Sequence, residues 1–200
     1  MRRNRSVMSR PKSIAVFCGS SPGFDPTYAT AARALAAALV RRDLRLVYGA
    51  GSVGLMGVVA DEVLRLGGNV LGVIPRFLVD MEVGHTGLTE LIVTESMHQR
   101  KLIMAENSDA FLAMPGGIGT LEEIIEVFTW TQLGIHRKHC GLLNTNNFYG
   151  KLAELLAHMG GQGFLKPETV RQLHITADPG ELVDALMRDV PDYTPKWVGR

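Results

Sequence analysis

The sequence predicts an α/β fold, a sandwich of one parallel sheet with helices on both of its faces. Short runs rich in apolar and β-branched residues alternate with longer helical patterns along the chain. The runs are apolar at nearly every position, which is typical of strands buried on both faces. Glycine-rich turns follow several of the runs, as they do where strands lead into helices in such folds. The length of 200 residues suits one domain.

The first strands and helices are signalled by clear boundaries. The run SIAVFC at 13–18 is the first strand, and a Gly/Ser turn follows it. Asp25 can cap the next helix, which carries alanine and leucine on one face and ends near Arg42. The second strand, 44–48, leads through a glycine-rich turn into a helix that ends before Gly67.

The alternation continues to the end of the chain. Pro75 begins a stretch to residue 90 with weak structural signals. The other expected strands are 69–74, 91–94, 110–114, 140–143 and 174–176, and the other expected helices are 97–107, 121–133, 148–159 and 179–187. Such a Rossmann-like sheet, with its right-handed crossovers, binds ligands at the carboxyl ends of its strands.

Charge and composition exclude several classes of protein. Residues 1–12 hold five of the 21 basic residues and no acid, so the remainder carries 16 basic and 20 acidic residues. A body with that balance lacks the electrostatic footprint of nucleic-acid binding. We therefore expect a disordered basic arm at 1–12, one α/β domain over 13–200, and no nucleic-acid partner.

Membrane and secreted proteins are also excluded. The longest stretch rich in alanine and leucine, 29–40, is broken by Arg33 and is too short to span a bilayer. Cys18 and Cys140 are the two cysteines, and both fall within expected strands. This usage is typical of a reduced, cytoplasmic protein with no membrane partner.

Three glycine-rich loops follow expected strands and therefore meet at one edge of the sheet. Glycine lets the backbone approach a ligand closely, and the helix N-termini behind the loops attract a phosphate. The candidate binding residues in these loops are Gly19, Ser20, Gly49, Gly51, Gly116, Gly117, Ile118, Gly119 and Thr120.

Of two familiar nucleotide-binding motifs, one is incomplete and the other is absent. Gly49, Gly51 and Gly54 fit the pattern G-x-G-x-x-G, but no acid stands at the end of the next strand to hold ribose hydroxyls, which disfavours a nicotinamide cofactor. The P-loop pattern G-x-x-x-x-G-K-[ST] does not occur.

Two charged motifs leave alternatives open. Thr120 and Glu123 fit a capping box, in which both would only satisfy a helix start, yet Glu123 can also point into the crevice and act on a bound nucleotide. Arg100 and Lys101 fall in the first turn of the preceding helix, where a cation opposes the helix dipole and favours a nearby anion. They are either solvated or directed at a phosphate or at Glu123. The histidines show no metal-ligand spacing, so no metal is expected.

Five segments together resemble the LONELY GUY family of cytokinin riboside 5′-monophosphate phosphoribohydrolases, often labelled lysine decarboxylase-like. They are VFCGSS at 16–21, GSVGLMG at 51–57, MHQRK at 97–101, PGGIGTLEE at 115–123 and TWTQLGIH at 129–136. The resemblance covers roughly residues 13–165, and the ordered pair MHQRK and PGGIGTLEE is its most specific part.

The resemblance implies Arg100 and Glu123 as catalytic residues. It implies substrate binding by Lys101, by the loop 117–120 and by Thr129, and, from spacing alone, by Glu82. It also implies a homodimer, a small nucleotide 5′-monophosphate as substrate, and no cofactor. Ala50 replaces a glycine that is common in the family.

Other functions are kept as alternatives. One is a broader nucleosidase for AMP or other purine nucleotides, and another is a non-catalytic nucleotide-binding module. A module would not need both Arg100 and Glu123. A pyridoxal-phosphate lysine decarboxylase is disfavoured by the short chain and by its six lysines, of which only Lys101 lies beside the expected site.

Overall fold

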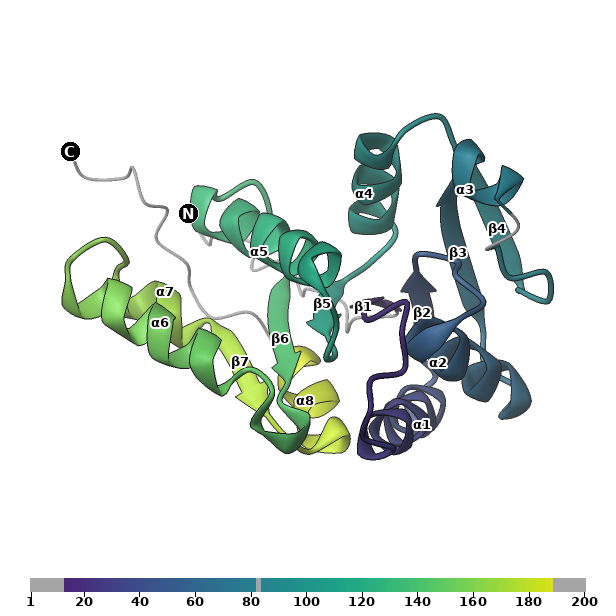
Figure 1. Ribbon diagram of the computed structural model, residues 1–200. Coiled ribbons are helices and arrows are strands. Elements are labelled where there is room, and N and C mark those ends of the chain that lie inside the picture. The colour runs from purple at the N-terminus through teal and green to yellow at the C-terminus, as the bar shows by residue number, and fades with distance from the viewer. Residues whose placement is uncertain (1–12, 82–83, 189–200) are drawn as a thin grey trace, which may run out of the picture.

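The sheet has seven parallel strands in the order β4-β3-β2-β1-β5-β6-β7 (Figure 1). The computed structural model describes residues 13–81 and 84–188, so the predicted basic arm lies outside the described residues. The strands are β1 Ser13–Phe17, β2 Arg45–Tyr48, β3 Val70–Pro75, β4 Glu90–Thr94, β5 Ala110–Ala113, β6 His139–Leu143 and β7 Leu173–Thr176. All seven coincide with predicted strands to within about two residues, and the predicted fold class is confirmed.

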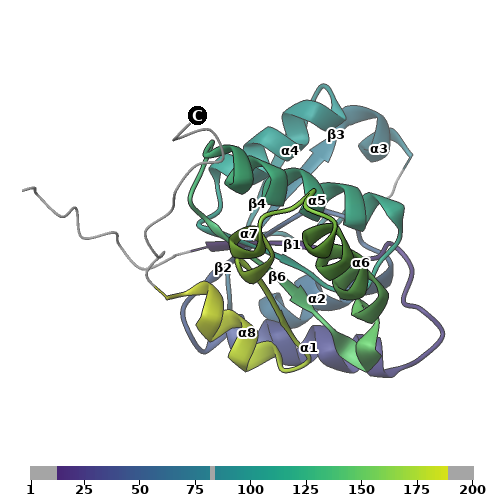
Figure 2. The same ribbon diagram turned by 90° about the vertical axis from the view of Figure 1, so that its left-hand side faces the viewer.

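Helices cover both faces of the sheet (Figure 2). The apolar layer on one face joins α1 Thr27–Val40, α2 Gly54–Arg65 and α8 Pro179–Leu186 to the strands. The layer on the other face joins α4 Met97–Glu106, α5 Ile118–Leu133 and α6 Gly150–Gly161. Both layers are built from strand residues that alternate in direction, which explains why the strands are apolar throughout.

The chain reverses its direction of travel across the sheet between β1 and β5. From β1 the strands β2, β3 and β4 follow outward on one side, whereas β5, β6 and β7 follow on the other. Ile14 pairs with Leu46 of β2 and with Ala110 of β5. Beyond the strand ends, the Gly19 N–H donates to the Pro115 carbonyl at 3.1 Å. This topological switch point is where sheets of this kind open a crevice for a ligand.

Some boundaries differ from the predictions for local reasons. Helix α1 is flanked by Pro26 at its N-cap, and the Asp25 carboxylate instead accepts the Thr27 N–H at 2.8 Å from one residue further out. The stretch with weak signals contains the short helix α3, Arg76–Asp80, which begins directly after β3. A second short helix, α7 at Pro167–Arg171, was not predicted, although proline at its first position is a known start signal.

Candidate active site

A cavity of about 210 Å³ lies at the switch point, over the carboxyl ends of β1, β2 and β5. Eight of the predicted site residues line it: Gly19, Ser20, Gly49, Arg100, Gly117, Gly119, Thr120 and Glu123. A second cavity of about 250 Å³ shares Gly19, Ser20 and Gly117 with the first, and Gly116 lines that one. The three predicted loops therefore meet, as the fold class requires.

Two glycines in these loops are needed because other atoms come close. A Cβ at position 49 would collide with the guanidinium of Arg100, and a Cβ at position 116 would overlap the Thr120 side chain and the Gly19 nitrogen. Ala50, in contrast, is fully buried and has a φ of 56°, in the left-handed region that favours glycine. The alanine thus occupies a conformation that suits the glycine common in the resembled family.

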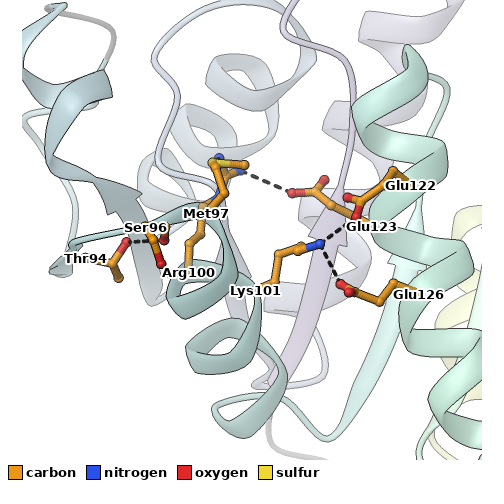
Figure 3. A network of polar contacts seen from close by, with 8 residues as sticks. All are labelled: Thr94, Ser96, Met97, Arg100, Lys101, Glu122, Glu123 and Glu126. Carbon is orange, nitrogen blue, oxygen red and sulfur yellow. Dashed lines mark hydrogen bonds and ion pairs between the residues drawn. The ribbon is translucent and has the colours of Figure 1, made fainter.

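Helix α4 brings Arg100 to the cavity. The Ser96 hydroxyl caps the helix by accepting the Gln99 N–H at 3.2 Å, and the Gln99 side chain accepts the Glu95 N–H at 2.8 Å. At the end of β4, the Thr94 hydroxyl donates to the Ser96 carbonyl at 3.1 Å. These bonds fix the helix start, so Arg100 projects from the first turns toward α5 (Figure 3).

Arg100 and Glu123 form a buried pair between α4 and α5. Arg100 Nη2 lies 3.3 Å from Glu123 Oε1, and each residue is 8% exposed. Arg100 Nη1 contacts the sulfur of Met97 at 3.8 Å. Arg100 Nε is buried and has no hydrogen-bond partner within the described chain. A buried donor with no partner is costly, so this nitrogen is well placed to serve a bound ligand.

The surroundings of Glu123 oppose its ionisation. Burial raises the pKa of its carboxyl above the ordinary value, and the guanidinium of Arg100 offsets part of that increase. Glu122 and Glu126 raise the same pKa, whereas Lys101 lowers it. A carboxyl with an elevated pKa beside a cavity is typical of groups that exchange protons during a reaction.

The capping-box alternative for Glu123 is wrong. Helix α5 begins at Ile118 with Gly117 as its N-cap, so Thr120 already lies inside the first turn. The prediction placed this start at Leu121, three residues too late. The first N–H groups of α5 have no partner within the helix, Gly117 provides no side-chain cap for them, and Gly117, Gly119 and Thr120 at this helix start line the cavity.

Lys101, the next residue on α4, takes a different direction. Its ammonium lies 2.5 Å from a carboxylate oxygen of Glu122 and 2.8 Å from one of Glu126 (Figure 3). The sequence had suggested that these two glutamates form an exposed face; Glu122 is exposed as expected, whereas Glu126 is half-buried, and both pair with Lys101. Lys101 lines neither cavity.

Three other predicted residues also do not line either cavity. Gly51 forms an isolated β-bridge with Gly84, and Ile118 is 82% exposed. Thr129 is also exposed, and its hydroxyl donates to the Ile125 carbonyl. Glu82 lies outside the described residues. The binding roles expected for these positions stay predictions.

Sequence reasoning missed several residues that line the two cavities. Met97, Met56 and Cys18 line the first cavity. Burial raises the pKa of the Cys18 thiol, which keeps it neutral. Tyr28 and Phe148 line the second cavity, with ring centroids 6.1 Å apart in an edge-to-face contact. Met97 opens the motif that supplies Arg100, a signal that pointed to its place; Tyr28 and Phe148 carry no such signal.

Residues 13–81 and 84–188 contain neither a cluster of metal-ligating side chains nor a helix suited to span a membrane. Nowhere in these two ranges do three or more His, Cys, Asp or Glu side chains gather into a group that could hold a metal ion. Within the same part of the chain, every helix is too short or too polar to cross a membrane.

Comparison with known proteins identifies relatives over most of the chain. Residues 56–186 match the sequence model of a family described as possible lysine decarboxylase. A cytokinin riboside 5′-monophosphate phosphoribohydrolase of Rhodococcoides fascians is 48% identical over 169 residues, which are 84% of this chain and 85% of that protein. An Arabidopsis thaliana protein of the same description is 49% identical over 181 residues, 90% of this chain and 79% of the relative.

Solved structures share the fold. The molybdenum cofactor binding protein of Rippkaea orientalis superposes with a TM-score of 0.67 at 21% identity, covering 90% of this chain and 99% of that one. The molybdenum cofactor carrier protein of Chlamydomonas reinhardtii gives a TM-score of 0.66 at 18% identity, covering 88% and 96%. At these identities the likeness concerns the fold alone.

Proposed function

The chain belongs to the possible lysine decarboxylase family and is similar over most of its length to cytokinin riboside 5′-monophosphate phosphoribohydrolases, and we propose that it shares their activity. It would hydrolyse the bond between the base and the ribose of an N6-substituted adenosine 5′-monophosphate. The products would be the free base and ribose 5-phosphate. The observation that carries this proposal is the buried pair of Arg100 and Glu123 at the edge of the switch-point cavity.

The glycine-rich loops would hold the 5′-phosphate. Gly19, Gly117 and Gly119 line the cavity, and the last two belong to the start of α5, where the first N–H groups have no partner within the helix. Such groups, together with the helix dipole, favour a phosphate. Holding the phosphate fixes the sugar, which lowers the entropic cost of reaching the transition state.

Glu123 would act on the anomeric carbon and on water. Cleavage of an N-glycosidic bond develops positive charge on the ribose, as other glycoside hydrolyses do. The Glu123 carboxylate can stabilise that charge and accept a proton from the attacking water. The water oxygen then bonds to the anomeric carbon, and the base leaves with the bond's electrons and takes up a proton.

Arg100 would hold Glu123 in place and keep it ionised. Its guanidinium is the nearest positive charge to a carboxyl that burial would otherwise neutralise. Its unpartnered Nε offers a further donor toward a bound nucleotide. The joint burial of these two residues supports catalysis over a purely ligand-binding role, because a carboxylate that only accepted hydrogen bonds from ribose hydroxyls would not need a buried guanidinium beside it.

The decarboxylase in the family description does not fit the site. Lysine decarboxylation with pyridoxal phosphate needs a lysine that forms an imine with the cofactor. Neither cavity is lined by a lysine, and the ammonium of Lys101 is engaged by two carboxylates.

The test is chromatographic measurement of free base after incubation with three compounds: isopentenyladenosine 5′-monophosphate, AMP and adenosine. The proposal expects the first nucleotide to be the best substrate. It expects kcat/KM for adenosine to be lower than for AMP by at least about a hundredfold, because the phosphate contacts are lost. AMP as the best substrate would favour the broader nucleosidase, and equal rates with adenosine would show that the phosphate site is misassigned. If none of the three compounds releases free base, the protein is better explained as a non-catalytic nucleotide-binding module.

We also propose that the protein acts as a homodimer in the cytoplasm. Leu102 on α4, Leu133 at the end of α5 and Ile135 after it are large apolar side chains that are 43% to 66% exposed. A second copy on this surface would cover them, and exposed Thr129 of α5 would lie near the interface. Both cysteines are free thiols, which suits a reducing compartment. Sedimentation of the parent and of Leu133→Glu/Ile135→Glu tests the dimer, since the charged variant should sediment as a monomer.

A further inference from the structure

Lys101 stands between two carboxylates rather than at the cavity. Its ammonium contacts Glu122 at 2.5 Å and Glu126 at 2.8 Å, and its side chain is only 12% exposed. The two glutamates lie one turn apart on α5, and Glu123 follows Glu122 directly. Three carboxylates of one helix are therefore gathered opposite two cations of α4 (Figure 3).

The two cations divide the three carboxylates between them. Arg100 faces Glu123 inside, and Lys101 faces Glu122 and Glu126 nearer the solvent. Without the ammonium, two uncompensated negative charges would stand beside a third that is already buried. Like charges at such separations disfavour ionisation, most strongly where one group has lost its water.

We propose that Lys101 is a positioning residue: its ammonium neutralises the two carboxylates that flank Glu123 and so keeps Glu123 ionised against Arg100. The proposal rests on the function proposed above only in that ionised Glu123 is the reactive form. The directions of the charge effects agree with the geometry, because Glu122 and Glu126 raise the pKa of Glu123, whereas Lys101 and Arg100 lower it. The other titratable group at Glu123 is the Cys18 thiol, whose raised pKa leaves it neutral.

The geometry opposes the alternative in which Lys101 binds the substrate phosphate directly. Lys101 lines neither cavity, and its ammonium is already engaged by two carboxylates, of which Glu122 lines the first cavity. A phosphate arriving there would also meet the negative charge of Glu122. If Lys101 positions Glu123, replacing both glutamates by glutamine should offset the loss of Lys101. If Lys101 binds the phosphate, the same replacement should not offset it.

The experiment follows the ionisation of Glu123 directly. In the full chain, labelled with ¹³C at glutamate carboxyls, the Glu123 signal is the one that Glu123→Gln removes. Its titration midpoint is measured in the parent, in Lys101→Met, in Glu122→Gln/Glu126→Gln, and in the triple variant. We expect Lys101→Met to raise the midpoint by roughly one pH unit. We expect the glutamine pair alone to lower it, and the triple variant to return it close to the parent.

Each result decides the role. An unchanged midpoint in Lys101→Met overturns the proposal. If that variant does not fold, the glutamine pair decides instead, because a midpoint that stays or rises there contradicts it. KM gives a second readout. If Lys101 binds the phosphate directly, its loss should raise KM about tenfold or more in both variants that lack it. The proposal expects KM in the triple variant to return close to that of the parent. The titration needs no turnover, so failure of the proposed hydrolase would leave this inference separately testable.

Discussion

Two groups of charges join α4 to α5, and they differ in burial and in fit. The inner pair, Arg100 and Glu123, is nearly closed to solvent, yet its atoms stand 3.3 Å apart and one donor nitrogen has no partner. In the outer group the Lys101 side chain is about as buried, but its partners Glu122 and Glu126 are more exposed and the contacts are shorter. Consecutive residues on a helix diverge by about 100°, so one dipeptide supplies both groups.

The difference shows which group is organised for stability and which for chemistry. A buried ion pair with an unfilled donor is a poor stabilising device, because the desolvation of both charges is only partly offset. An outer pair costs less to form and contributes at most about 1 kcal/mol. The looser inner pair therefore has capacity left for a ligand, and the closer outer group holds the helices and the charge balance around it.

The largest expected effect is on the inner carboxyl. Glu123→Gln preserves shape but removes the negative charge, so base release should fall by roughly 100-fold to 10,000-fold. Nucleotide binding, measured by calorimetry with AMP, should stay nearly intact. The matched control is Glu122→Gln, the same change one residue outward, for which we expect a change of only a few-fold at pH 7. Similar losses in both variants would remove the distinction between the two groups.

Arg100→Ala should follow closely. Loss of one preorganised electrostatic donor reduces kcat by roughly 100-fold to 1,000-fold. Arg100→Lys should restore activity only in part, since a point charge does not reproduce the planar donor fork. Steady-state base release is the measurement, and a melting curve is the control for folding. An alanine variant that melts normally and keeps the parent rate would contradict the assignment of the pair.

A smaller loss of activity is expected when Arg100 is moved away from Glu123 than when either side chain is replaced. In Gly49→Ala the new methyl group would collide with the Arg100 guanidinium, which must move away from Glu123. A displacement of about 1 Å at a reacting centre costs roughly tenfold to a hundredfold in rate. Gly161→Ala is the control, because a Cβ there meets no atom within 4 Å. Equal rates in the two variants would mean that the position of Arg100 does not matter.

The smallest effect is on stability and depends on pH. The pKa of Glu123 is raised in the folded state above the ordinary value of 4.5. Its neutral form therefore adds to the free energy of unfolding below pH 4.5, and this contribution is lost as the pH rises through the folded-state pKa. Glu123→Gln is always neutral and avoids the loss. Its melting temperature relative to the parent should therefore rise between pH 4 and pH 7, by at most a few degrees. A melting-temperature difference that decreases between pH 4 and pH 7 would contradict this prediction.

The sequence allowed the fold to be predicted because the signals for it are local. Apolar runs, glycine turns and helix periods located all seven strands, and the parallel arrangement followed from the helices between them. The start of α5 was misplaced because Gly117 gives no side-chain signal for an N-cap, whereas Thr120 imitates one. Side-chain caps do stand at other helices, at Ser96 for α4 and at Asp178 for α8.

The site was predictable as far as its residues follow from strand ends. Parallel topology accounts for the meeting of the three loops and places Arg100 and Glu123 at the same edge of the sheet, whereas their pairing is seen only in the structure. The partners of Lys101 do not, since a one-residue step on α4 decides which carboxylates it reaches. Tyr28 and Phe148 come from separate segments that only the tertiary fold brings together at the second cavity.

The pairing of β1 with β5 also has a consequence for how the protein folds. Ile14 and Ala110 lie side by side in the sheet although 96 residues separate them in the chain. Closing so long a loop reduces the conformational entropy of the chain before the contacts it allows can stabilise the fold. Contacts between residues far apart in the sequence therefore slow folding. The cavity opens at that same junction, between Gly19 and Pro115. A partly folded chain in which this junction is unmade therefore has no nucleotide site, and the appearance of binding during refolding should report the joining of the two halves of the sheet.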